Sequence, residues 1–410
     1  MRHIVKPLLR HRLMPLLVVL QVALACAIAC NAFFLLQQRL VPILTPDGVG
    51  EPDQLIVAWQ IASRGQPWPQ SRLQEVEVAL RALPGVAAVS IAGSFPMETT
   101  AQMNGNVLAD GTGIRGDSAV YIGDNLVDTL DLKLVAGRDF SASEKATQYK
   151  DVGINANGPA IITRALAEQL FPDGQALGKV VRIGDAADAG RRTVVGVVEH
   201  LMRNQLGQDD RDDIDYSMLF PGIPGMFPVP VFGVRTNTTN IERVRKGIKA
   251  TIEHQLGNEL VQGFEPQYEM YGHLRDRMLA RSKAAVWLLA GVSVVVLVVT
   301  LAGIMGLTSY WVQQRTRQIG VRRALGAQRS HILHAVQIEN LLVVGTGVLL
   351  GLLAAYAINL WLMRHYELAR LPWIYLPLGA VLMLVLGQLA VLGPARRAAR
   401  VPPVVATRAV

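Results

Sequence analysis

The chain has 410 residues, of which 51% are hydrophobic, and its mean hydropathy of +0.29 is too high for an ordinary soluble domain of this length. Its formal net charge is +8 and its sequence pI is about 9.6. The densest basic segment, residues 315–332, has no interleaved aromatic side chains that could stack on bases. We therefore expect a membrane protein that has no nucleic-acid partner.

Four long uncharged segments are the predicted membrane spans. A helix needs roughly 20 apolar residues to cross the hydrocarbon core of a bilayer. The uncharged runs are Leu13–Leu36, Ala284–Gln314, Asn340–Met363 and Leu371–Ala395. Because the last run contains Pro372 and Pro377, its helix is expected to begin near Leu376. The predicted transmembrane helices cover residues 13–36, 284–311, 338–363 and 376–395.

Short basic segments orient these spans, because Lys and Arg near span ends are retained in the cytoplasm. Residues 1–12, 312–337 and 396–410 are rich in Lys and Arg, whereas the 364–375 loop has Arg364 at its edge and Arg370 inside. Residues 37–283 carry 25 basic and 30 acidic side chains, net −5, and the rest of the chain carries 15 and 2, net +13. We expect both termini and residues 312–337 inside, with residues 37–283 and the 364–375 loop outside.

The basic N-terminal segment and the apolar run after it could be mistaken for a signal peptide. The run is 24 residues long, however, whereas the apolar region of a signal peptide has roughly 7–15. Cys26 and Cys30 lie within this run and are the two cysteines of the sequence. We expect an uncleaved anchor helix and an outer domain without disulfides.

Residues 37–267 are expected to form a mixed α/β domain with two lobes. Leu55–Ile61, Gln70–Leu83 and Val86–Ala92 have the patterns of a strand, a helix and a strand, which is one β-α-β unit. A similar unit follows late in the segment, with strands at Val231–Thr236 and Gln262–Tyr268 around a helix at about 240–256. Residues 100–225 between the two units are predicted to be a β-rich second lobe with one clear helix, at Arg164–Phe171.

A helical stalk over residues 268–283 is expected to connect this domain to the second span. Tyr271, Leu274 and Met278 stand at helical spacing beside three arginines. The predicted fold class is thus a membrane protein of four transmembrane helices, with a large two-lobed α/β domain inserted between the first two.

Motifs of enzymes and metal sites are weak in this sequence. Residues 111–116 (GTGIRG) fit a dinucleotide fingerprint, but a strand pattern follows them where that motif needs a helix, so a turn between strands is the better interpretation. The acidic run at 209–215 (DDRDDID) lacks the glycine and terminal glutamate of an EF-hand loop. We expect a non-catalytic chain that holds no cofactor and no metal.

The four uncharged runs contain no Asp, Glu, Lys or Arg, which argues against an ion-coupled transporter. Glu339 lies at the cytoplasmic edge of the third span, and Gly347 and Gly351 inside this span form a GxxxG motif. The motif fits helix packing within the chain as well as dimerisation.

The basic segment before the third span has the pattern of a short helix. Residues 317–325 contain one weak breaker, Gly320, and Gly326 stands where a left-handed cap would end the helix. Contact of the arginines with lipid headgroups would explain the charge alone.

The order of residues in this segment resembles a more specific pattern. RQIGVRRALGA, Arg317 to Ala327, resembles the signature between the second and third spans of MacB/FtsX-type ABC transporter permeases, in which Gln318 replaces the usual glutamate. Residues 136–144, 165–184 and 194–200 resemble the periplasmic core of that family, and residues 393–408 resemble its C-terminal tail. The order of one span, a large domain and three spans is also similar.

The resemblance implies a permease of a bacterial inner membrane whose large domain lies in the periplasm. Its cytoplasmic coupling helix would dock on an ABC ATPase that binds ATP and Mg. The sequence contains no phosphate-binding loop, so we expect the ATPase on a separate polypeptide. A second permease copy or paralogue, a periplasmic adaptor and an outer-membrane channel are the other implied partners. The implied docking residues are Arg317, Ile319, Gly320, Arg322, Arg323, Leu325 and Gly326.

Three functions are compatible with the resemblance. The first is export of an amphiphile, peptide or drug from the periplasm. The second is an FtsX-like mechanotransmitter that controls a cell-wall hydrolase, and the third is a lipoprotein-release permease. The size of the outer domain favours the first.

Overall fold

A computed structural model describes most of the chain. The described residues are 13–98, 103–111, 113–147, 156–184, 190–203, 213–224, 229–237, 239–366 and 370–400. The predicted cytoplasmic N-terminus at 1–12 and residues 401–410 of the predicted tail lie outside them. The chain divides into two compact units, which we call the helical unit (residues 1–40 and 282–410) and the inserted domain (residues 41–281).

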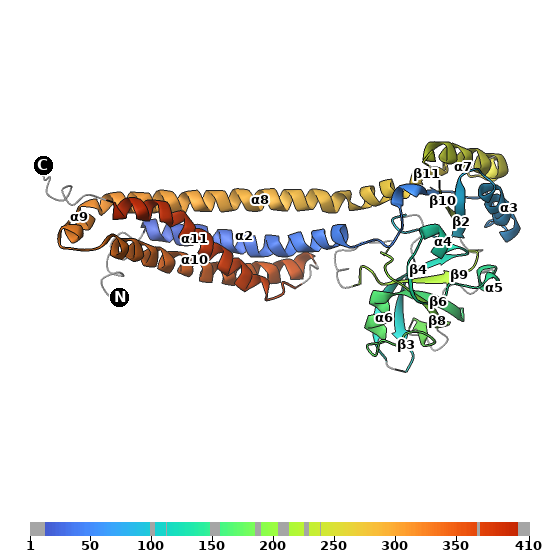
Figure 1. Cartoon of the computed structure of the whole chain (residues 1–410), viewed down its shortest axis with the longest axis horizontal. Coiled ribbons are helices and arrows are strands. Elements are labelled where there is room, and N and C mark those ends of the chain that lie inside the picture. The colour runs from blue at the N-terminus through green and yellow to red at the C-terminus, as the bar shows by residue number, and fades with distance from the viewer. Residues whose placement is uncertain are drawn as a thin grey trace. The chain divides into compact units, whose positions relative to one another are not determined.

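Among the described residues, four helices are long and apolar enough to cross a membrane, as predicted (Figure 1). These are α2 (Leu13–Leu44), α8 (Tyr271–Gln314), α10 (Arg329–Tyr366) and α11 (Tyr375–Ala399), and the short α9 (Thr316–Ala324) follows α8. Each long helix extends beyond its predicted span, because apolar composition marks the hydrocarbon core while the backbone hydrogen bonds of a helix continue past it.

The inserted domain has two lobes, and the first is an antiparallel sheet with two helices packed on it. Its strands run in the order β11–β1–β10–β2, and the apolar residues of α3 and α7 share one buried cluster with them. Its elements are β1 (Leu55–Trp59), α3 (Gln70–Arg81), β2 (Val86–Ala92), β10 (Val231–Thr236), α7 (Ile241–Leu256) and β11 (Gln267–Met270), with 3-10 turns at Pro52–Gln54 and Gly257–Glu259. Both predicted β-α-β units are present, but the last strand, predicted at Gln262–Tyr268, lies at Gln267–Met270.

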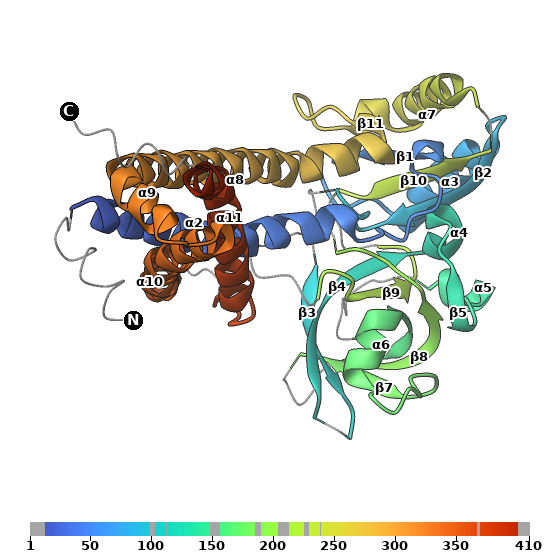
Figure 2. The same ribbon diagram turned by 60° about the vertical axis from the view of Figure 1, so that its left-hand side comes forward.

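The second lobe is built around a closed ring of strands. The pairing order β4–β3–β7–β8–β6–β9 returns to β4 through a parallel β4–β9 pair, and β5 adds to β8. Figure 2 shows α6 among these strands. The elements are β3 (Asn104–Ala109), β4 (Arg115–Gly123), α4 (Leu126–Leu130), β5 (Leu134–Gly137), α5 (Ala142–Lys145), β6 (Gly158–Thr163), α6 (Arg164–Leu170), β7 (Val180–Ile183), β8 (Gly190–Val198) and β9 (Ser217–Pro221).

Two expectations for the inserted domain are corrected. Residues 100–225 contain α4, which packs on β2 and β10 of the first lobe, and α5 besides the predicted helix α6, and both are too short for apolar spacing to reveal them. The predicted stalk does not begin at residue 268, because β11 pairs with β1 as far as Met270. The helix therefore starts at Tyr271, where the two-residue alternation of the strand gives way to helical spacing.

Candidate functional site

The helix α9 follows α8 after a single residue, Arg315, and ends where the sequence predicts. Gly326 has a φ of +93°, and the N–H of Ala327 donates to the carbonyl oxygen of Arg322 at 3.0 Å. This is the bonding pattern of a Schellman cap, in which glycine takes the left-handed position at no steric cost. The predicted helix and its glycine cap are confirmed.

One face of α9 is exposed and combines apolar and basic side chains. Gln318, Val321, Arg322 and Leu325 stand at helical spacing and are all exposed, with 82% of Leu325 accessible. Exposing so much leucine surface to water forgoes the free energy that burial of the side chain would release. In the described part of the chain no ion pair holds Arg322. The face is complementary to a partner with an apolar pocket and acidic side chains.

The structure divides the predicted docking residues into two groups. Arg317, Arg322, Leu325 and Gly326 are exposed, whereas Gly320 is buried and Ile319 is half-buried. Arg323 lies in the backbone of α9, but its side chain is outside the described residues. Ile319 and Gly320 therefore face the helical unit, and a partner would meet the other group.

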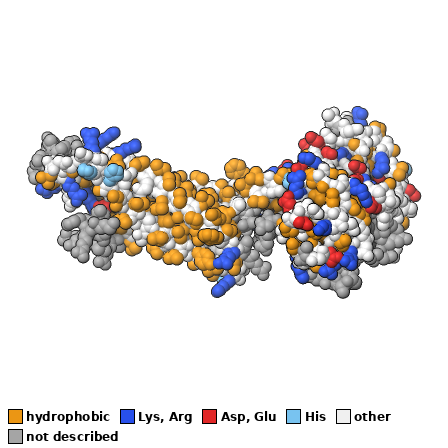
Figure 3. Space-filling view, turned by 60° about the horizontal axis from the view of Figure 1, so that its bottom comes forward, with side chains coloured by type: hydrophobic (Ala, Val, Ile, Leu, Met, Phe, Trp, Pro, Cys, Tyr) orange, Lys and Arg blue, Asp and Glu red, His pale blue; other side chains and the backbone are white. Residues whose placement is uncertain are grey.

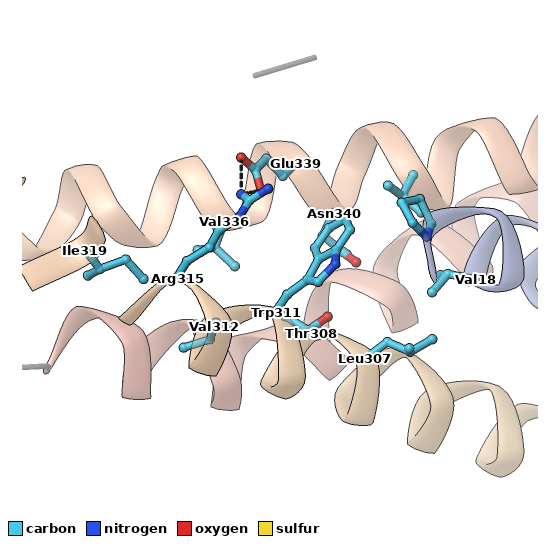
Figure 4. A pocket seen from close by; sticks show the side chains of 12 residues that line it. Val18, Leu307, Thr308, Trp311, Val312, Arg315, Ile319, Val336, Glu339 and Asn340 are labelled. Carbon is cyan, nitrogen blue, oxygen red and sulfur yellow. Dashed lines mark hydrogen bonds and ion pairs between the residues drawn. The ribbon is translucent and has the colours of Figure 1, made fainter. Parts of the chain in front are cut away.

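Arg315, the residue between α8 and α9, is bonded to Glu339 of α10. Its Nη1 atom lies 2.8 Å from Oε2 and 3.1 Å from Oε1 of Glu339, and its guanidinium lies 5.4 Å from the centroid of the Trp311 ring (Figure 4). The side chains of Arg315 and Glu339 are 27% and 17% exposed. Sequence reasoning placed Glu339 at the edge of a span but did not pair it, although a lone acid beside a basic segment was an available signal.

A cavity of about 50 Å³ lies beside this ion pair. Figure 4 shows Arg315, Glu339, Trp311 and Ile319 around it. It is lined by Pro15, Val18, Leu307, Thr308, Trp311, Val312, Arg315, Ile319, Val336, Glu339, Asn340 and Val343. Residues of α2, α8, α9 and α10 thus enclose a mainly apolar space next to the junction of α8 and α9.

The GxxxG residues of α10 face α2. A Cβ atom on Gly347 would lie 2.9 Å from the carbonyl oxygen of Val19, and one on Gly351 would lie 2.6 Å from that of Ala23. Such distances leave no room for a side chain, so the two glycines allow the backbones to approach closely. Both glycines thus pack within the chain.

The predicted stalk residues pack into the inserted domain. Tyr271 is fully buried, Leu274 is buried, and Met278 packs against the same apolar cluster. The Tyr271 hydroxyl donates to Oδ2 of Asp47 at 3.3 Å, and Nε of Arg275 lies 2.9 Å from the same oxygen. The first turns of α8 are therefore fixed to the domain core.

The weak motifs have structural roles where they are described. Residues 111–116 lie at the hairpin turn between β3 and β4, as expected, with Arg115 and Gly116 already in β4 and residue 112 outside the described residues. Of the acidic run, residues 209–212 are also outside, while Asp213 pairs with Arg203 and Asp215 with His200. Among the described residues no group of three or more His, Cys, Asp or Glu side chains is placed to hold a metal ion.

The surface of the helical unit distinguishes its sides from its end. Apolar side chains cover the sides of the helices, Lys, Arg and His side chains gather at one end, and a smaller group of Lys and Arg lies toward the other end (Figure 3). Together with four apolar helices and a domain inserted after the first, this distribution defines a multi-pass membrane protein with a folded domain outside the bilayer.

Comparison with known families specifies this class further. Residues 35–277 match the family of the MacB-like periplasmic core domain, and residues 290–403 match the FtsX-like permease C-terminal domain. Since the first match alone covers more than half of the chain, the chain belongs to the MacB/FtsX-type ABC transporter permeases. Membership makes it a permease-type transporter subunit and identifies the inserted domain as one of periplasmic type.

Individual relatives are distant. The macrolide export ATP-binding/permease protein MacB of Chromobacterium violaceum is 25% identical over 295 residues, which are 70% of this chain and 42% of that protein. The uncharacterized ABC transporter permease YvrN of Bacillus subtilis is 25% identical over 302 residues, or 70% of this chain and 69% of YvrN. The chain thus spans about two fifths of MacB and about two thirds of YvrN.

Among solved structures, the periplasmic region of MacB from Actinobacillus actinomycetemcomitans is similar with a TM-score of 0.36 and 13% identity. The match covers 58% of this chain and 97% of that structure.

Proposed function

We propose that this chain is the permease subunit of a MacB-like ABC transporter in the bacterial inner membrane. A separate cytoplasmic ATPase, which binds ATP and Mg, docks on α9. Its hydrolysis cycle changes the conformation of the inserted domain in the periplasm and so exports an amphiphile, a peptide or a drug. The transporter contains a second copy or paralogue of the permease, and a periplasmic adaptor and outer-membrane channel complete the route.

The exposed face of α9 is the observation that carries this proposal. Lipid anchoring depends on total positive charge, at about 1 kcal/mol per basic residue near an anionic surface. It would not require Leu325 and Val321 to project from the same face as Arg322. A protein partner benefits from both, because apolar contact supplies affinity and arginine supplies directional hydrogen bonds.

Capture of the ATPase tests the proposal. We expect Leu325→Asp to reduce co-purification of the ATPase sharply and the double change Arg322→Lys/Arg323→Lys to reduce it less, while membrane insertion stays unchanged. Gln328→Asp, which adds the same charge at an exposed position just after the helix, is the matched control and should retain the partner. Wild-type stoichiometry in all three variants would show that the segment is only an anchor.

Orientation is tested by thiol labelling in a variant without Cys26 and Cys30. Both reporter positions are exposed: Ser143 in the inserted domain and Ser330 near the start of α10. A cysteine at Ser143 should react with an impermeant reagent from the periplasm, and one at Ser330 should react only after the inner membrane is opened. The opposite pattern would invert the proposed topology.

Export is favoured over the other functions of related permeases. The match to the MacB-like periplasmic core extends over residues 35–277, which include both lobes of the inserted domain. An adaptor recovered with the complex would support export, whereas a cell-wall hydrolase would indicate an FtsX-like mechanotransmitter. Recovery of lipidated proteins would indicate lipoprotein release.

A further inference from the structure

We propose that Arg315 and Glu339 form a positioning pair, which fixes the junction of α8 and α9 to α10 and passes movement of α9 to the membrane helices. The proposal rests on the proposed function in that α9 is taken as the docking helix. Neither residue belongs to the exposed face that would meet the ATPase, so the pair would act behind the contact.

The first argument is the place of Arg315 in the backbone. It is the single residue between α8 and α9, and its N–H donates to the carbonyl oxygen of Trp311 at 3.2 Å while its own carbonyl accepts from Ile319 at 2.9 Å. Backbone hydrogen bonds thus continue through the junction. A force on α9 reaches α8 at this residue.

The second argument is the partner of Arg315. Glu339 is the single acidic residue in the described part of the helical unit. The side chains of Arg315 and Glu339 are only 27% and 17% exposed, and a charge-assisted hydrogen bond is roughly twice as strong as a neutral one. The pair therefore holds α10 to the junction through a strong and specific contact among otherwise apolar helices.

The third argument is that the contact continues to α11. Asn340, the neighbour of Glu339, donates from Nδ2 to the carbonyl oxygen of Gly387 at 3.1 Å. Consecutive residues of α10 thus bond the α8–α9 junction on one side and α11 on the other. This is a physical connection across three membrane helices at the end that carries α9.

The cavity supplies room for the movement. Arg315 and Ile319 both line the cavity of about 50 Å³, so the side chains beside the junction leave a small space unfilled (Figure 4). Interiors that are packed without voids resist displacement, whereas an unfilled space permits a second arrangement. We expect the Arg315–Glu339 ion pair to set how closely α10 follows a movement of α9.

The test measures distances in the complete permease–ATPase complex. Spin labels are placed at Ala324 on α9 and Ile338 on α10, both exposed and neither among the predicted docking residues, in a variant without Cys26 and Cys30. We expect a narrow distance distribution that shifts when ATP binds. In Glu339→Gln the distribution should broaden and the ATP-dependent fraction should fall roughly fivefold or more, in the range of measured coupling energies.

Three comparisons separate positioning from loss of folding or docking. Arg315→Gln should reproduce the effect, and the exchanged pair Arg315→Glu/Glu339→Arg should restore the narrow distribution. Arg364→Gln, at the far end of α10, should behave as the wild type. Capture of the ATPase should be unchanged in every variant, because the exposed face is intact.

Two results would each contradict a different claim, one the proposed function and the other the positioning role of the pair. If the wild type captures no ATPase, the proposed function is wrong. If the wild type captures it and Glu339→Gln retains both the narrow distribution and the ATP response, the pair does not position α9 and the inference is wrong.

Discussion

The inserted domain and the helical unit are stabilised by different interactions. The domain buries charged groups in networks, for example Arg203, which is 2% exposed and pairs with Asp117 and Asp213. The helical unit contains one described acidic residue and relies on close contacts such as Gly351 against Ala23. Water drives apolar side chains into the core of the domain, but lipid provides no such force between helices.

This difference shows where movement is possible. The first turns of α8 are fixed in the domain by buried Tyr271 and by hydrogen bonds to Asp47, whereas the last turn borders a cavity and one ion pair. We expect a change in the core of the inserted domain to affect the stability of the whole domain. We expect the end of α8 that adjoins α9 to move with α9 while the rest of the helix keeps its contacts.

The largest expected effect is the loss of the aromatic anchor of α8 in the domain. Tyr271→Ala removes a side chain that is 0% exposed and should lower the free energy of unfolding of the domain by about 3–5 kcal/mol, as for other buried aromatic residues. Denaturation of the full-length protein, followed by near-UV circular dichroism, measures it. Tyr310→Ala on the same helix, where 45% of the side chain is exposed, should cost far less. Equal losses of unfolding free energy in the two variants would show that Tyr271 contributes no more to stability than an exposed tyrosine of the same helix.

The second effect is a pH dependence of the stability of the inserted domain. Burial and the neighbouring Asp124 raise the pKa of Glu77 to about 7. Because the folded protein holds this proton more tightly than the unfolded chain, the wild type loses stability as pH rises from about 5 to 8. Glu77→Gln should be unchanged at pH 5 and more stable than the wild type at pH 8, by at most about 3 kcal/mol.

Glu144 provides the opposite case within the same domain. The Arg138 guanidinium and the backbone of Ser141 lower its pKa to about 2. Its contribution is therefore present above the unfolded pKa near 4.5 and lost as pH falls toward 2. The free energy of unfolding of the domain, measured from pH 3 to pH 8, tests the direction of both effects. If the difference in this free energy between Glu77→Gln and the wild type does not change with pH, the prediction for Glu77 is wrong.

The smallest effect concerns helix packing in the membrane. Gly351→Ala places a methyl group against α2 and should destabilise the helical unit by about 1–3 kcal/mol through overpacking. Gly345→Ala on the same helix meets no atom within 4 Å and is the matched control. Thermal unfolding in lipid nanodiscs measures both. If Gly345→Ala is as destabilising as Gly351→Ala, close approach to α2 is not what holds α10.

Sequence patterns predicted the positions of helices and strands well, but they did not predict which of these elements contact each other. Uncharged runs identified the four spans, and Gly326 identified the end of α9, because both signals are local. The parallel β4–β9 pair and the contact of Gly351 with α2 join segments far apart in the chain. Periodicity shows that a face is apolar but not which face it meets. The same reason left Arg315 and Glu339 unpaired, although each was visible in the sequence.

Transmission through α8 can be tested most directly with a hinge. Inserting two glycines between Arg281 and Ser282 interrupts α8 at the division between the units and costs about 1 kcal/mol per glycine in a helix interior. Hydrogen–deuterium exchange of residues 41–281 is then compared with and without ATP in the reconstituted permease–ATPase complex. We expect the wild-type domain to change its exchange with ATP, and the insertion variant to hydrolyse ATP without that change. A domain that still responds in the insertion variant would contradict mechanical coupling through α8.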